Sequence, residues 1–202
     1  MPLKMTGFLI VFLTLITAGS LPSLDLSTLL RQGPVITIQQ DGKGRFQSAT
    51  ARVYVNAPPE YVWNTILDLD NYKKFMPKVV FSRVLRREAN HIIARFEIEV
   101  PMVNTKYTLR YNPDRERNRI DIKRVEGDLA GSHWHWRLTP MKKGTLVTYT
   151  GTTKNFSSLL SRVEDDQQTI TVGVNISAVM AATKAVKIKA EADYAAAGGK
   201  GG

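Results

Sequence analysis

The feature that most constrains this fold is a change of hydrophobic period late in the chain. Six strand-like segments come first, at approximately 78–87, 91–100, 103–112, 118–126, 131–139 and 144–153. A mostly apolar stripe then steps by three or four positions, which predicts one long helix over roughly 158–194. The residues of this stripe are Val163, Gln167, Ile170, Val174, Ala178, Ala181, Ala185 and Ile188. Consecutive strands with short connections form an antiparallel meander. The expected fold class is therefore α+β.

Two of these segments alternate clearly between apolar and polar residues, as half-buried strands do. One face of the second segment carries Ile92, Ala94, Phe96, Ile98 and Val100, and one face of the fifth carries Trp134, Trp136 and Leu138. The breaks between segments contain Gly, Pro, Asn and Asp, which favour turns.

The N-terminal half predicts a hairpin followed by short helices. Segments 35–40 and 46–56 flank the turn Asp41-Gly42-Lys43-Gly44. A helix is expected over about 58–69, and a second short helical turn ends at Pro77. A curved antiparallel sheet wrapped around the long C-terminal helix, a helix-grip arrangement, fits this order of elements.

The first residues resemble an export signal. Lys4 precedes an uncharged apolar run, Gly7–Ala18, of 12 residues, and Ala18-Gly19-Ser20 supplies small residues for cleavage. This run is too short for an ordinary membrane span. A buried N-terminal helix and an uncleaved anchor are the alternatives. We therefore expect an exported protein that is periplasmic, or membrane-anchored and facing the periplasm.

These signals divide the chain into four parts. We expect a signal peptide or anchor at 1–20, and a linker or short helix with the first hairpin strand at 21–44. The folded domain spans 45–194, and a glycine-rich, disordered tail occupies 195–202.

Charge and cysteine content limit the partners and the chemistry. The chain has 202 residues, a formal net charge of +10 and no cysteine. The charge suits an anionic partner, although a solvated basic surface explains it equally well. The lack of cysteine excludes disulfides, a cysteine nucleophile and thiolate metal sites.

Two stretches resemble a known superfamily. Residues 51–88, ARVYVNAPPEYVWNTILDLDNYKKFMPKVVFSRVLRRE, resemble the opening of START-like proteins, a group that includes polyketide cyclases, birch-allergen proteins and coenzyme-Q-binding proteins. The likeness rests on Ala57-Pro58, Glu60, Val62-Trp63, Asp68, Tyr72, Phe75-Met76-Pro77 and Ser82-Arg83-Val84-Leu85. Residues 131–152, GSHWHWRLTPMKKGTLVTYTGT, resemble the family's late strand pair. The resemblance covers roughly 45–190.

The resemblance implies a cavity between the sheet and the long helix that encloses a lipid, quinone or polyketide-like molecule. The expected function is to bind and carry such a molecule. A cyclase or dehydratase acting on a similar substrate is an alternative, because fold alone does not decide between them. An interaction module with a filled core is another.

Several residues are candidates for lining this cavity. The predicted ligand-binding residues are Phe96, Tyr107, Tyr111, Trp134, Trp136, Ile170, Val174 and Ala178. Small residues on the long helix would leave volume that a solid core normally fills: Gly173, Ser177, Ala178, Ala181 and Ala182. A packed core without a cavity is the alternative interpretation of the same residues.

Other polar residues predict no chemistry. His133 and His135 share a strand face, as a metal site could use, but they oppose Trp134 and Trp136 and should point outward. His91 is expected on the outward face as well. We predict no catalytic residue, no metal and no cofactor.

The end of the long helix suggests a contact with a membrane surface, in addition to the ligand in the cavity. Lys184, Lys187 and Lys189 make it basic and amphipathic, which suits a membrane surface. Lysines near a helix C-terminus also favour its dipole without any partner. No nucleic-acid partner is expected, because no recognised reading motif is present.

Overall fold

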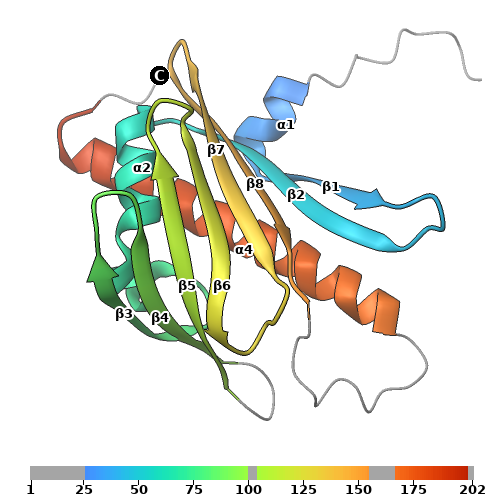
Figure 1. Ribbon diagram of the computed structural model, residues 1–202. Helices are drawn as coiled ribbons and strands as arrows, with labels where there is room; N and C mark the ends of the chain where they lie inside the picture. Colours follow the sequence, from blue (N-terminus) through green and yellow to red (C-terminus); the bar gives the residue numbers. More distant parts are fainter. Residues whose placement is uncertain (1–25, 100–103, 155–166, 200–202) are drawn as a thin grey trace, which may run out of the picture.

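The computed structural model describes residues 26–99, 104–154 and 167–199 (Figure 1). Its helical elements are α1 (Leu26–Gln32), α2 (Pro59–Leu67), the 3₁₀ helix η1 (Leu69–Asn71), α3 (Tyr72–Phe75) and α4 (Gln167–Ala196). Its strands are β1 (Val35–Gln40), β2 (Phe46–Val55), β3 (Val79–Arg87), β4 (Ile92–Ile98), β5 (Thr105–Asp114), β6 (Arg119–Gly127), β7 (His133–Met141) and β8 (Gly144–Thr152).

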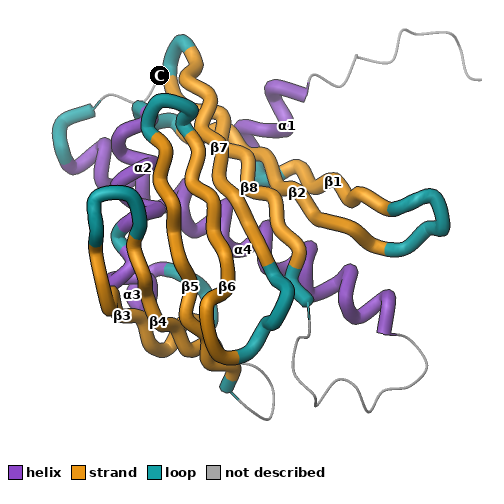
Figure 2. The backbone as a smooth tube through the Cα atoms, viewed as in Figure 1, coloured by secondary structure: helices purple, strands orange, loops and turns teal. Residues whose placement is uncertain are grey.

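The strands of the described chain form one eight-stranded antiparallel sheet. Its order is β1-β2-β8-β7-β6-β5-β4-β3. Figures 1 and 2 show the sheet curving in front of α4, with the β1–β2 hairpin reaching past its edge. The predicted α+β helix-grip fold is confirmed, and each predicted strand is present within two residues of its expected ends.

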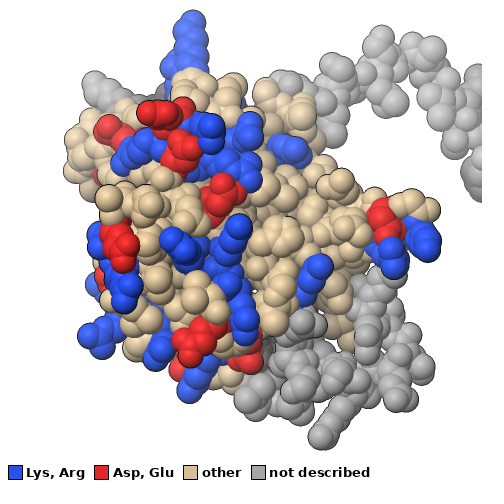
Figure 3. Space-filling model, in the orientation of Figure 1, with Lys and Arg blue, Asp and Glu red and all other residues tan. Residues whose placement is uncertain are grey.

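Strand alternation sends one face of the sheet inward and the other outward. The inward face packs on α2 and α4 and buries Val53, Val55, Ile120, Ile122, Trp136 and Val147, with Val62, Trp63, Ile66 and Val186 from the helices. Full burial of such a side chain stabilises the fold by roughly 1.5–3 kcal/mol. The outward face carries many charged side chains, which Figure 3 shows, together with a few exposed apolar ones such as Phe81 and Val125.

The buried stripe of α4 differs from the predicted one. Asn175, Val179, Thr183, Val186 and Ala190 are buried, whereas Ile188, expected in the apolar stripe, is 58% exposed. The stripe differs because two polar residues, Asn175 and Thr183, face the core, where their side chains form hydrogen bonds. Asn175 bonds to Thr153, and the Thr183 hydroxyl donates to the Val179 carbonyl at 2.6 Å.

Helix α4 is both the longest helix of the described chain and an apolar one. Residues Thr169–Ala196 are long and apolar enough to span a membrane by these two criteria alone. The core helix of a folded domain passes the same test, and α4 packs against β2, β8 and α2. The start predicted for this helix, 158–166, lies outside the described residues.

The predicted disordered tail is wrong for its first residues. Ala195 and Ala196 belong to α4, and Gly198 has a φ of 80° just beyond it. The Gly199 amide donates to the Tyr194 carbonyl at 3.0 Å, and the Gly198 amide donates to the Ala195 carbonyl at 3.0 Å. Glycine suits this left-handed position, so the glycines that suggested disorder instead cap the helix.

The N-terminal region is only partly described. The short helix expected within 21–34 is present as α1, and it is docked rather than a free linker, because the Arg31 guanidinium lies 4.1 Å from the centre of the Tyr54 ring. The predicted signal peptide at 1–20 lies outside the described residues.

Candidate ligand-binding cavity

A cavity of about 540 Å³ lies between the inward face of the sheet and α4. Strands β3 to β8, the α3 turn and the N-terminal half of α4 all contribute to it. Its lining is Tyr72, Met76, Pro77, Lys78, Val79, Phe96, Ile98, Glu99, Tyr107, Leu109, Tyr111, Ile122, Leu129, Trp134, Trp136, Tyr149, Thr153, Gly173, Val174, Ser177, Ala178, Ala181 and Ala182. This volume is in the range of small-molecule sites.

Aromatic rings form the sheet wall of the cavity. Trp136 stacks on Tyr149, its direct cross-strand partner, with ring centres 3.9 Å apart and planes 16° apart. Phe96 packs against Tyr72, Tyr107 and Tyr111 at centroid distances of 5.6, 5.9 and 6.3 Å. Rings held in this way present flat apolar faces whose positions are fixed by their neighbours.

The helical wall consists mostly of small residues. Gly173, Ser177 and Ala181 recur every fourth position and therefore share a face of α4, with Ala178 and Ala182 beside them. Larger side chains here would occupy the space between helix and sheet. The cavity therefore exists because this part of α4 lacks them.

Seven of the eight predicted ligand-binding residues line this one cavity, and Ile170 is partly buried outside its lining. Sequence reasoning missed Tyr72 and Tyr149. Tyr149 alternates in phase with the buried Val147 and Gly151, a signal that could have found it. Tyr72 lies on a helix of four residues, too short to show a period.

The four tyrosines of the lining fall into two kinds. The Tyr72 hydroxyl donates to the Ile66 carbonyl at 2.6 Å and accepts from the Tyr111 hydroxyl. The hydroxyls of Tyr107 and Tyr149 form no hydrogen bond with any described residue. Burial raises the pKa of all four phenols, so they stay protonated at neutral pH.

Asn175 joins α4 to the end of β8 beside the cavity. Its Oδ1 accepts from the Thr153 amide at 2.6 Å, and its Nδ2 donates to the Thr153 carbonyl at 3.0 Å. The Thr153 hydroxyl in turn accepts from the Trp134 indole at 3.2 Å. The amide of Asn175 thus positions both a lining residue and a ring of the wall.

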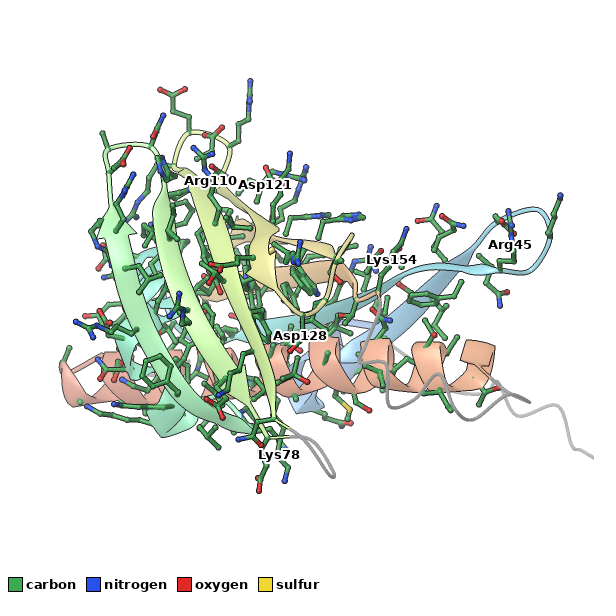
Figure 4. The ribbon with its side chains drawn as sticks, turned by 60° about the horizontal axis from the view of Figure 1, so that its bottom comes forward. Arg45, Lys78, Arg110, Asp121, Asp128 and Lys154 are labelled. Atoms are coloured by element: carbon green, nitrogen blue, oxygen red, sulfur yellow. The ribbon has the colours of Figure 1, made fainter. Side chains whose placement is uncertain are left out.

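The charged groups of the lining lie at its rim. Lys78 and Glu99 form an ion pair at 3.4 Å, and their side chains are 71% and 59% exposed. Figure 4 shows Lys78 at the end of the sheet where β3 begins, and Lys154 just beyond the end of β8. Among the lining residues there is no histidine, and Glu99 is the sole carboxylate.

The histidines lie away from the cavity. His133 is exposed and His135 half-buried on the outward face, on either side of inward-pointing Trp134. The outward position predicted for His91 is wrong, because it lies just before β4 and is buried, with Nδ1 2.8 Å from Asn90 Oδ1. The described residues contain no cluster of three or more potential metal ligands.

A curved antiparallel sheet closed by one long helix over an apolar cavity defines the START-like class of proteins. Within it, the chain belongs to the polyketide cyclase / dehydrase and lipid transport family, whose model matches residues 55–178. A search of curated proteins finds no significant match.

Solved structures share this fold at low sequence identity. The protein TTHA0849 from Thermus thermophilus has a TM-score of 0.65 at 21% identity, over 73% of this chain and 99% of that one. The Zhui aromatase/cyclase from Streptomyces sp. R1128 has 0.63 at 20%, over 76% and 99%. A STAR-related lipid transfer protein from Xanthomonas axonopodis has 0.58 at 15%, over 77% and 98%.

Proposed function

We propose that this protein binds and carries an apolar small molecule, of lipid, quinone or polyketide-like character, in the cavity between sheet and α4. The observation that carries the proposal is the cavity of about 540 Å³ itself, with aromatic rings on one wall and small residues on the other. Burial of ligand surface would drive binding, at roughly 25 cal/mol per Å² before the cost of association.

The family and its structural relatives are consistent with this proposal and with an enzymatic alternative. Among the neighbours are a lipid transfer protein and an aromatase/cyclase. General acid–base catalysis needs a group inside the cavity whose pKa is close to the working pH. The titratable groups inside the described lining are tyrosines whose pKa burial raises further, which favours carrying over catalysis.

Two further components of the proposal concern location. Residues 1–20 would export the chain to the periplasm, where it would remain free or anchored; the mass of the mature protein tests this. A membrane contact would use the basic end of α4. There, Lys187 is paired with Glu191 at 2.5 Å and Lys189 with Asp193 at 2.6 Å, so Lys184 is the lysine most available to headgroups.

Native mass spectrometry of the full chain, purified from a host with its membranes, tests the central component. We expect an adduct that organic solvent extracts and that added quinones or fatty acids replace. Bare protein that shows no mass shift with either class of molecule would count against carrying.

A further inference from the structure

The unpaired hydroxyls of Tyr107 and Tyr149 give the apolar cavity two fixed hydrogen-bonding groups. They come from different strands, β5 and β8, and each ring is held by an aromatic neighbour. Tyr72 and Tyr111 differ, because their hydroxyls are already used in a chain that ends at the Ile66 carbonyl. Both tyrosines belong to the cavity lining, and both are only partly buried, so a polar atom of a bound ligand can act as the hydrogen-bond partner of these hydroxyls.

The chemistry of that partner follows from the surroundings. A neutral phenol donates one hydrogen bond and accepts others, so an oxygen acceptor on the ligand satisfies it. A ligand carboxylate or phosphate would need a cation, and the one cation of the described lining, Lys78, lies at the rim in a pair with Glu99. An uncharged oxygen therefore fits better than an anionic group.

We propose that Tyr107 and Tyr149 bind the carbonyl or hydroxyl oxygen of an uncharged ligand whose remaining surface is apolar. This inference rests on the proposed function and adds to it the chemical class of the cargo. Hydrocarbon chains without a polar group, and ligands with a charged headgroup inside the cavity, are the classes that it disfavours.

A matched pair of probes tests this inference: 9-fluorenone, which has a carbonyl, and fluorene, which lacks it. Both are titrated as competitors of the neutral dye Nile red against wild type and Tyr107→Phe/Tyr149→Phe. The fluorenone affinity should fall about tenfold in the variant, while the fluorene affinity changes less than about twofold. Equal changes for both probes, or no displacement by either, would overturn the inference.

Two readouts separate this inference from the function on which it rests. If Nile red itself does not bind wild type, the proposed function fails; if it binds but the probes behave alike, only the tyrosine assignment fails. The infrared carbonyl stretch of fluorenone bound to wild type is a test that requires no variant. It should move to lower wavenumber than in an alkane solvent, and an alkane-like position would contradict the hydrogen bonds.

An independent observation concerns the outward face of the sheet, where cations lie directly opposite cations. Arg83 of β3 pairs in register with Arg95 of β4, and Arg110 of β5 with Lys123 of β6. Side chains in such positions are close neighbours, and like charges there destabilise a sheet. We call these four exposed residues the basic sheet face; Figure 3 shows Lys and Arg gathered over this part of the sheet.

Little within the described chain neutralises this charge. Arg95 has one ion pair, with Glu126 at 3.9 Å, and both side chains are more than half exposed. Arg83, Arg110 and Lys123 form no ion pair with a described residue; Asp121, the carboxylate that Lys123 attracts, is already paired with Arg119 at 2.6 Å. The repulsion therefore persists in the isolated molecule and would be relieved by an anionic surface.

Apolar side chains accompany these cations. Phe81 is 39% exposed and Val125 50% exposed, and each lies two residues along a strand from a cation of the face, Arg83 and Lys123. Cations interspersed with exposed apolar side chains match the interface of an anionic bilayer. We infer that the basic sheet face docks this protein on anionic membrane surfaces.

Cosedimentation with vesicles tests this docking. Phosphatidylcholine vesicles containing phosphatidylglycerol should bind wild type, and pure phosphatidylcholine should not. Arg110→Gln/Lys123→Gln should weaken binding by about an order of magnitude. Lys142→Gln/Lys143→Gln removes the same charge from the exposed β7–β8 turn and should change it less than about threefold.

Several results would overturn the docking inference. One is an equal loss in both double variants, since net charge alone would then explain binding. Another is a loss confined to Lys184→Gln, which would leave the end of α4, already proposed above as a membrane contact, as the contact that binds the vesicles. Absence of vesicle binding, or tighter binding of polyadenylate than of anionic vesicles, would also contradict it.

Discussion

The Asn175 side chain holds the backbone of Thr153 at both of its polar groups, accepting from the amide at 2.6 Å and donating to the carbonyl at 3.0 Å. Asn175 is 1% exposed, so neither group of Thr153 has solvent as an easy substitute. This one residue therefore joins the helical and sheet walls of the cavity at the end of β8.

Asn175→Ala should destabilise the domain by about 2–4 kcal/mol, because it leaves both Thr153 groups buried without their partner. Urea unfolding of the two proteins measures the difference. Asn64→Ala, an exposed position on α2, is the matched control, since it makes the same helical substitution and should stay within about 0.5 kcal/mol of wild type. Equal stabilities for the two variants would contradict the role assigned to Asn175.

Gly151→Ala should displace the indole of Trp134. Gly151 faces Trp134 across the β7–β8 pair, and an added Cβ would overlap Trp134 Cδ1. Overpacking of this kind costs about 1–3 kcal/mol. Tryptophan emission and urea unfolding both report on it, with Gly42→Ala as control because a Cβ there meets nothing within 4 Å. Unchanged emission together with unchanged stability would argue against this packing.

Stability should fall between about pH 7 and pH 5 in part because of His135. Burial, assisted by Arg119, lowers the pKa of His135 below its ordinary value of about 6.5. As the pH falls through that value, the unfolded chain takes up this proton before the folded protein does, which favours unfolding. His135→Gln should therefore lose less stability than wild type over this interval. An NMR titration midpoint for His135 at or above that of the urea-unfolded chain would contradict the shift.

The strands and the class of fold were predictable because two of the strands alternate clearly and the breaks between the strands contain residues that favour turns. The β7 pattern, with Trp134 and Trp136 inward and His133 outward, placed two rings of the sheet wall correctly. The small residues of α4, such as Gly173 and Ala181, also predicted where space would lie. These patterns involve residues close together in the chain, so they can be recognised in a single sequence.

The parts that could not be predicted depend on contacts between distant segments. Asn175 is buried only because the Thr153 backbone lies beside it, so a hydrophobic pattern places the stripe of α4 wrongly and includes Ile188. Tyr72 reaches the cavity from a single helical turn. That turn is fixed on β3 by the hydrogen bond from the Lys73 amide to Ser82 Oγ, at 3.1 Å.

The central claim, that the space between sheet and α4 holds an apolar molecule, is tested most directly by filling it. Ala181→Phe and Ala178→Phe place a ring among the residues that line the cavity, whereas Ala192→Phe makes the same change at a position of that helix outside the lining. Nile red fluorescence titrations of the three variants and wild type, with urea unfolding to confirm that each is folded, measure the effect. We predict saturable binding by wild type and Ala192→Phe, and at least about a tenfold loss of affinity in both cavity variants. Equal affinities in all four proteins would contradict the claim.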